Sequence, residues 1–196
     1  THLPAWQFGY SLLTGSQRIG HENLRLRDAQ YVRSIEDRLA ASAGVSDTRP
    51  PMFLPLKLRG LQIENRIVVS PMAQYCAVDG LPTDWHVVHY GARATGGAGL
   101  VVTEMTCVSP EGRITPGCTG IWNDAQRDAW RRIVAFTHEN SRARICLQIG
   151  HSGRKGSTQL GWQEADHPLP SGNWQTLAPS PLPYLEGRSA VPRAME

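Results

Sequence analysis

No apolar run in the sequence approaches the roughly 20 residues that a helix needs to cross a bilayer, which excludes a transmembrane span. The four cysteines form no C-x-x-C pair, so neither a zinc knuckle nor a secreted disulfide framework is favoured. The 20 basic and 17 acidic residues are scattered and leave a formal charge of only +3, unlike the basic patch of a nucleic-acid-binding protein. We expect a cytoplasmic protein with reduced, mostly buried thiols and no membrane or nucleic-acid partner.

The chain also lacks a starting methionine and a signal segment in which a basic stretch precedes an apolar one. It ends on Met195 and Glu196 with no element that would close a domain. Its 196 residues suffice for one sizeable core but are few for two domains. We therefore expect an excised piece of a longer protein.

Residues 1–44 begin with a polar, arginine-rich stretch and continue with a helical pattern. Asp28 can cap this helix and Gly44 can end it. Its apolar residues recur three and four positions apart, at Tyr31, Val32, Ile35 and Leu39. The next segment, 45–51 (VSDTRPP), contains two consecutive prolines that resist both helix and strand. We predict a linker there, and with it a domain boundary.

From Met52 onward, short strands alternate with helices. Arg59 and Gly60 are flanked by the apolar stretches 53–58 and 61–63, a pattern typical of a hairpin. Three further aliphatic strands are predicted at 66–69, 100–102 and 145–149. Regular periodicity then fails from Gly156, and six prolines crowd residues 168–192. Such a stretch indicates a loop that covers an active site, a domain that has been cut, or both.

Two predicted helices separate the three strands. Thr83 can cap the first, which ends at Gly96 and Gly97, and the second begins at Asn123 or Asp124. The apolar side of the first helix is assigned to Val87, Val88, Tyr90 and Ala94. The second helix runs through Trp130, Ile133, Val134 and His138.

Aliphatic strands joined by helical crossovers pair in parallel with both faces covered. The right-handed crossover rule leaves a doubly wound open sheet or a (β/α)8 barrel. No G-x-G-x-x-G follows the first strand, so the main argument for a dinucleotide-binding open sheet is missing. We therefore predict an α/β fold, a partial TIM (β/α)8 barrel over residues 52–196 with a hairpin at its bottom and about three βα units.

In parallel α/β folds, ligands bind at the carboxyl ends of the strands. Those ends are the polar segments 70–75, 103–106 and 148–155. The Gln148 amide supplies both a donor and an acceptor, and backbone N–H groups at strand ends can meet carbonyl oxygens. This edge would suit a planar polar heterocycle.

Five segments in this order carry a resemblance to the old yellow enzyme family of NAD(P)H:flavin oxidoreductases, in its YqjM-like branch. They are 67–72 (IVVSPM), 86–90 (HVVHY), 111–113 (EGR), 120–122 (GIW) and 148–155 (QIGHSGRK). The resemblance implies a TIM barrel that holds FMN, takes hydride from NADH or NADPH and passes it to an activated alkene.

The resemblance also implies roles for particular residues. Met105 would offer its backbone N–H to the flavin O4 region, Gln148 would bind the pyrimidine edge, and Tyr75 would lie on the substrate side. The residues expected along the flavin are Ser70, Pro71, Met72 and Ala73. Ala73 stands where this branch often has a cysteine, and Cys76 is not its replacement. The catalytic residues stay unknown, because the family's substrate-binding histidine pair, its flavin-contacting arginine and its phosphate-binding strands are expected beyond the C-terminus.

Residues 1–44 resemble, through segments 9–14 (GYSLLT) and 22–28 (ENLRLRD), the end of an FAD-dependent aromatic-ring monooxygenase domain. Bifunctional aryl-CoA enzymes, the 2-aminobenzoyl-CoA monooxygenase/reductases and salicylyl-CoA 5-hydroxylases, join such a domain to an old yellow enzyme barrel. This second resemblance implies an FAD site upstream and a dearomatised aryl-CoA as substrate, where the old yellow enzyme resemblance alone implies an enone. Neither resemblance decides whether the protein is a homo-oligomer.

Several residues allow two interpretations. His86 and His89 have a spacing that could bind metal, but helix packing is favoured and no metal site is expected. His151 and the pair Arg154-Lys155 could line a ligand site or serve only the loop. Glu104 is expected to be a buried, hydrogen-bonded anchor, and Tyr75 could simply pack under the proline-rich loop. For the chain as a whole, the alternative to an enzyme is a non-catalytic segment that joins two catalytic modules.

Overall fold

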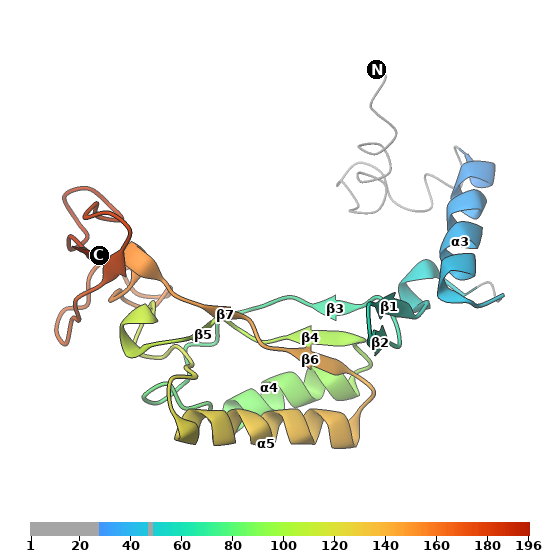
Figure 1. Cartoon of the computed structure of the whole chain (residues 1–196), viewed down its shortest axis with the longest axis horizontal. Coiled ribbons are helices and arrows are strands. Elements are labelled where there is room, and N and C mark those ends of the chain that lie inside the picture. Colours follow the sequence, from blue (N-terminus) through green and yellow to red (C-terminus); the bar gives the residue numbers. More distant parts are fainter. Residues whose placement is uncertain (1–27, 47–48) are drawn as a thin grey trace.

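The computed structural model describes residues 28–46 and 49–196 (Figure 1). The segments that resemble a monooxygenase domain, 9–14 and 22–28, lie outside the described residues except for Asp28. Two residues of the predicted linker, 47 and 48, lie outside them as well. The linker and the domain boundary therefore stay predictions.

Helix α3 (Ala29–Ala43) forms where the sequence predicts it. The Asp28 carboxylate accepts a hydrogen bond from the Tyr31 backbone N–H at 2.8 Å, which satisfies a donor that the first turn would leave unpaired. Gly44 closes the helix in the left-handed conformation, with φ of 69°. Val32 is the buried residue of this helix, and the other predicted apolar positions are half-buried. A short 3-10 helix, η1 (Pro51–Phe53), contacts α3 and leads into the sheet.

Strands β1 (Leu56–Leu58) and β2 (Leu61–Ile63) pair as the predicted antiparallel hairpin. Next come β3 (Val68–Val69), β4 (Leu100–Val102) and β6 (Arg144–Cys146), which form a parallel sheet in the order β3-β4-β6. The hairpin lies at the end of the sheet where these strands begin (Figure 1). This arrangement confirms the predicted parallel pairing.

Helices α4 (Asp84–Thr95) and α5 (Asp124–Asn140) lie together on one face of this sheet (Figure 1). Thr83 and Asn123 are their N-caps, as the sequence indicates. At Gly91 of α4, an added Cβ would lie 2.6 Å from the Phe136 ring, so the absence of a side chain allows the two helices to approach. Residues from both helices, from β4 and from the connections before β4 and β6 form the core: Tyr90, Ala94, Ala98, Val101, Trp130, Ile133 and Ala143.

Val88 was assigned to the apolar side of α4, and that assignment is wrong. Its side chain is 62% exposed, because the buried face of the helix follows His86, Tyr90 and Ala94 at four-residue spacing. Val88 lies about half a turn from Tyr90 and therefore points to solvent.

Beyond the sheet, short elements extend the strands and support the loops. β5 (Thr106–Cys107) pairs in parallel with β7 (Ile149–Gly150), so the predicted strand 145–149 is interrupted. Two 3-10 turns, η2 (Pro110–Gly112) and η3 (Gly153–Lys155), follow β5 and β7. The region after Gly156 also contains a parallel pair, β8 (Leu177–Ala178) with β9 (Arg193–Ala194), within otherwise irregular chain. None of the helices in the described residues is both long and apolar enough to span a membrane.

Candidate active site

A one-residue bulge interrupts the ladder at the carboxyl ends of the central strands. Val102 is paired with Cys146 and Thr106 with Ile149, so three residues between β4 and β5 face two between β6 and β7. The Thr103 N–H donates to the Cys146 carbonyl at 2.9 Å, and the Thr106 N–H donates to the Gln148 carbonyl at 2.7 Å. Bulges often re-aim groups beside active sites. This bulge leaves the Met105 N–H out of the ladder.

Unpaired polar groups gather along this edge. Within the described residues, neither the backbone N–H of Ala73 and Met105 nor the side-chain amide of Gln148 has a hydrogen-bond partner. The Gln148 backbone is fixed, because its N–H donates to Thr103 Oγ1 at 3.1 Å, while its side chain is exposed. The segment 70–73, which follows β3, is exposed as well. The residues expected to contact the flavin therefore sit at the ends of three neighbouring strands with free donors and an acceptor.

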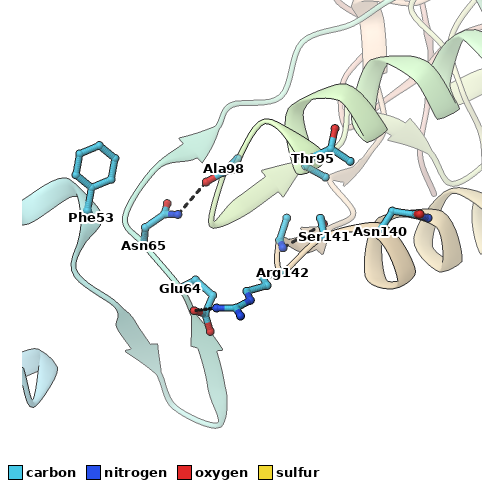
Figure 2. Close-up of a pocket in the computed structure, with 11 residues that line it drawn as sticks. Phe53, Glu64, Asn65, Thr95, Ala98, Asn140, Ser141 and Arg142 are labelled. Carbon is cyan, nitrogen blue, oxygen red and sulfur yellow. Dashed lines mark hydrogen bonds and ion pairs between the residues drawn. The ribbon is translucent and has the colours of Figure 1, made fainter.

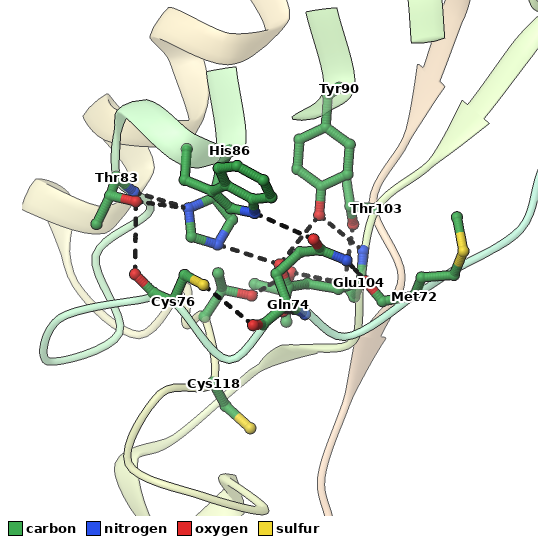
Figure 3. A network of polar contacts seen from close by, with 12 residues as sticks. Met72, Gln74, Cys76, Thr83, His86, Tyr90, Thr103, Glu104 and Cys118 are labelled. Carbon is green, nitrogen blue, oxygen red and sulfur yellow. Dashed lines mark hydrogen bonds and ion pairs between the residues drawn. The ribbon is translucent and has the colours of Figure 1, made fainter. Parts of the chain in front are cut away.

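A buried carboxylate lies beneath this edge (Figure 3). Glu104 is only 1% exposed, and its Oε2 accepts the Gln74 backbone N–H at 3.0 Å. Its Oε1 accepts the Tyr90 hydroxyl at 3.2 Å, and that hydroxyl in turn accepts the Glu104 backbone N–H at 3.0 Å. The expectation that Glu104 is a buried, hydrogen-bonded anchor is confirmed.

His86 completes the network from the first turn of α4. Its Nδ1 accepts the Thr83 backbone N–H at 2.8 Å, so the ring proton belongs on Nε2 and the imidazole is neutral. Nε2 lies 3.1 Å from Glu104 Oε1, although the N–H is not aligned for a hydrogen bond. Burial, followed by the negative charge of Glu104, raises the pKa of Tyr90 well above its ordinary value. Glu104 is thus a carboxylate held by neutral donors.

Tyr75 adopts a backbone conformation that is unusual for a bulky residue, with φ of 54°. The chain is fixed on both sides of it, because the Gln74 N–H binds Glu104 and the Ala77 N–H donates to the Gly117 carbonyl at 3.0 Å. The half-buried phenol ring meets the Trp162 ring edge-on, with 6.0 Å between the ring centroids. Burial raises the pKa of the Tyr75 hydroxyl, with a further contribution from Cys118.

Four of the remaining candidate residues, His86, His89, His151 and Lys155, make contacts within the protein. His86 and His89 are 0% and 5% exposed, which confirms helix packing. His151 Nδ1 accepts the Gly153 backbone N–H at 2.9 Å. Lys155 forms a 3.0 Å ion pair with Asp166, and hydrogen bonding to that carboxylate raises the pKa of the lysine. In the described part of the chain, no three His, Cys, Asp or Glu side chains come together in a way that could hold a metal ion.

The four thiols are free, but the prediction that they are mostly buried holds for only two. Cys76, in the loop after β3, and Cys146, at the end of β6, are exposed. Cys107 and Cys118 are buried, and the interaction between the two thiols raises the pKa of Cys107 and lowers that of Cys118 to about 7.

A pocket at the opposite end of the sheet differs in character from the carboxyl edge (Figure 2). Its volume is about 350 Å³, and its lining includes residues just before β3, β4 and β6. Glu64 and Arg142 form a 3.6 Å ion pair there, and the Asn65 amide donates to the Gly97 carbonyl at 2.8 Å. Its polar side chains are therefore engaged with the protein, whereas the Gln148 amide at the carboxyl edge has no partner among the described residues.

Sequence reasoning placed Glu104 correctly but missed its partners. His86 and Tyr90 were read as part of a packing face and a family motif, and Gln74 was left without a role. His86 and Tyr90 are four residues apart on the buried face of α4, and this spacing could have indicated that they share a partner. Nothing in the sequence around Tyr75 indicates its left-handed backbone, since only glycine adopts that region readily.

A parallel sheet covered by crossover helices, with its free polar groups at the carboxyl edge, defines a segment of a (β/α)8-type barrel. A model of the NADH:flavin oxidoreductase / NADH oxidase family matches residues 51–183. The chain belongs to this family.

Relatives and solved structures agree with this assignment. The NADH:flavin oxidoreductase FG08077 of Gibberella zeae is 34% identical over 177 residues, which cover 88% of this chain and 42% of the relative. Morphinone reductase matches with 31% identity and a TM-score of 0.61, over 78% of this chain and 41% of that one. The old yellow enzyme homologue from Zymomonas mobilis matches with 30% identity and a TM-score of 0.60, over 75% and 40%.

These structures confirm the predicted partial barrel fold. The chain spans about two fifths of the length of the relatives that it matches.

Proposed function

We propose that these residues form the FMN-binding part of a flavin-dependent NAD(P)H oxidoreductase that reduces an activated alkene. Family membership supports the redox class. The observation that carries the cofactor assignment is the set of unpaired groups at the carboxyl edge: the N–H of Ala73 and Met105 and the amide of Gln148. Donors and an acceptor on neighbouring strand ends fit the polar edge of an isoalloxazine ring.

Each residue has a defined role in this proposal. Met105 donates its N–H to the O4 region, and Gln148 pairs its amide with the pyrimidine edge. The segment 70–73 lies along the ring and excludes water from it. FMN, when bound, supplies the two-electron chemistry that links NADH or NADPH to the alkene.

Tyr75 is assigned to the substrate side. The phenol is protonated at neutral pH and burial raises its pKa further, so the hydroxyl can donate to a carbonyl oxygen that activates an alkene. Its position several residues beyond β3 supports a role away from the flavin-contacting segment 70–73.

We further propose that these 196 residues act within a longer, bifunctional protein. Its upstream part would be an FAD-dependent monooxygenase, and the barrel would then reduce a dearomatised aryl-CoA. The support is the sequence resemblance of 9–14 and 22–28 and the prolyl linker at 45–51. The remainder of the barrel would supply the catalytic histidines.

The test uses the full-length protein with FMN in the absence of oxygen. Addition of NADH or NADPH should bleach the absorbance band of oxidised flavin at about 450 nm. Addition of 2-cyclohexenone should then restore this band. A protein that retains no FMN after the free flavin is removed would instead support a non-catalytic segment between two modules. Bleaching without reoxidation by the enone would support FMN binding and would contradict the proposed reduction of an activated alkene.

A further inference from the structure

We propose that Glu104 is a positioning residue that fixes Tyr75 and the Met105 bulge relative to each other. The inference rests on the proposed function for the meaning of those two positions. In this proposal, the buried Glu104 carboxylate holds Tyr75 and Met105 in fixed positions relative to each other.

The network joins three elements through one side chain. Glu104 belongs to the bulge, its Oε2 holds the Gln74 N–H of the loop after β3, and its Oε1 holds the Tyr90 hydroxyl of α4. Its own carbonyl accepts the hydroxyls of Thr103 and Thr106 at 3.0 and 3.1 Å. The backbone and the side chain of Glu104 are therefore both fixed.

The charge of this carboxylate has no cationic partner among the described residues. His86 is the titratable side chain closest to it, and its Nδ1 accepts a backbone N–H, so the ring carries no positive charge. A buried anion without a counter-ion is held by hydrogen bonds from neutral donors, and losing any of them is costly. The carboxylate supplies two acceptor oxygens, one for the Gln74 N–H and one for the Tyr90 hydroxyl, which an apolar residue could not do.

The backbone conformation of Tyr75 requires fixed neighbours. A non-glycine residue in the left-handed region persists only where its surroundings fix it. The Gln74 N–H, directly before Tyr75, is bound to Glu104, and the Gly117 carbonyl binds the Ala77 N–H after it. The Gln74 side chain adds to this fixation, because its Nε2 donates to the Met72 carbonyl at 2.8 Å and its Oε1 accepts the Trp85 indole N–H at 3.1 Å.

The test compares Glu104→Gln with Tyr90→Phe in the full-length protein. Glutamine keeps the shape but replaces one carboxylate oxygen by an NH2 group. Tyr90→Phe removes both contacts of Glu104 with the Tyr90 hydroxyl and keeps the carboxylate that accepts the Gln74 N–H. Hydrogen exchange of the Gln74 amide, normalised to the Val101 amide of β4, is the first measurement. Glu104→Gln should accelerate it several-fold, which is about the difference between a hydrogen bond to a charged acceptor and one to a neutral acceptor, and Tyr90→Phe should change it less.

The second measurement is a double-mutant cycle with Tyr75→Phe. If Glu104 acts through Tyr75, Glu104→Gln should raise KM for the enone several-fold in the wild type and leave it unchanged in the Tyr75→Phe background. Additive effects, or unchanged Gln74 exchange, would overturn the inference.

If Glu104→Gln fails to fold, Glu104→Asp keeps the charge but shortens the reach, and it should still expose the Gln74 amide. Should the wild type bind no FMN, the proposed function fails, while the exchange measurement still decides whether Glu104 fixes the loop.

Discussion

Gln148 offers the sharpest separation between a ligand-binding role and a structural one. Its side chain is exposed and unpartnered in the described residues, and only its backbone N–H, bound to Thr103 Oγ1, takes part in the fold. Gln148→Leu should therefore leave the stability of the protein unchanged. It should weaken FMN binding, because the flavin groups that the amide would satisfy are left without a partner.

The size of the effect follows from the penalty for an unpaired polar group, about 1 to 3 kcal/mol. Since 1.4 kcal/mol corresponds to a factor of ten, the dissociation constant for FMN should rise roughly 5- to 150-fold. Quenching of flavin fluorescence during titration of the full-length protein measures this constant. Gln62→Leu, the same substitution in β2 at the opposite end of the sheet, is the matched control and should change nothing. Equal FMN affinity in wild type and Gln148→Leu would refute the assignment.

Three further results are expected. In Gly117→Ala, the new Cβ would clash with the Tyr75 carbonyl oxygen, so the free energy of unfolding should fall by about 1 to 3 kcal/mol, measured by thermal melting. Gly60→Ala, with open space around the new Cβ, should leave it unchanged. Burial raises the pKa of Tyr90 above the unfolded value of 10, so its stabilising contribution is complete below pH 10. Above pH 10 this contribution should be lost at about 1.4 kcal/mol per pH unit, so in urea titrations the free energy of unfolding should fall less steeply for Tyr90→Phe than for the wild type. Residues 1–196 alone should unfold without a sharp transition in calorimetry, because β3 and β6 are open edges and Val68 is 50% exposed; a cooperative melt of the monomer would contradict this.

Local sequence rules predicted the parts of the fold that depend on neighbouring residues. Asp28, Thr83 and Asn123 cap helices, and the hairpin turns at Arg59 and Gly60, because each of these signals acts within a few residues. Parallel pairing followed from aliphatic strands joined by helical crossovers.

Features that depend on contacts between residues far apart in the sequence could not be predicted from local patterns. The bulge at 103–105 exists only relative to the register of the neighbouring strand, which the local pattern does not encode. The left-handed Tyr75 is fixed by Glu104 and Gly117, which follow it by 29 and 42 positions. The strand pair β8 and β9 likewise depends on pairing across an irregular segment. Positions of the candidate flavin contacts came from family resemblance combined with the rule that ligands bind at strand carboxyl ends.

FMN binding by the full-length protein tests the central claim most directly. Equilibrium titration of the apoprotein with FMN, followed by flavin fluorescence and absorbance, should show saturable binding of about one FMN per chain, as expected for one site at the carboxyl end of a barrel. Free flavin that remains fully fluorescent at every protein concentration, with folded protein verified by circular dichroism, would contradict the account.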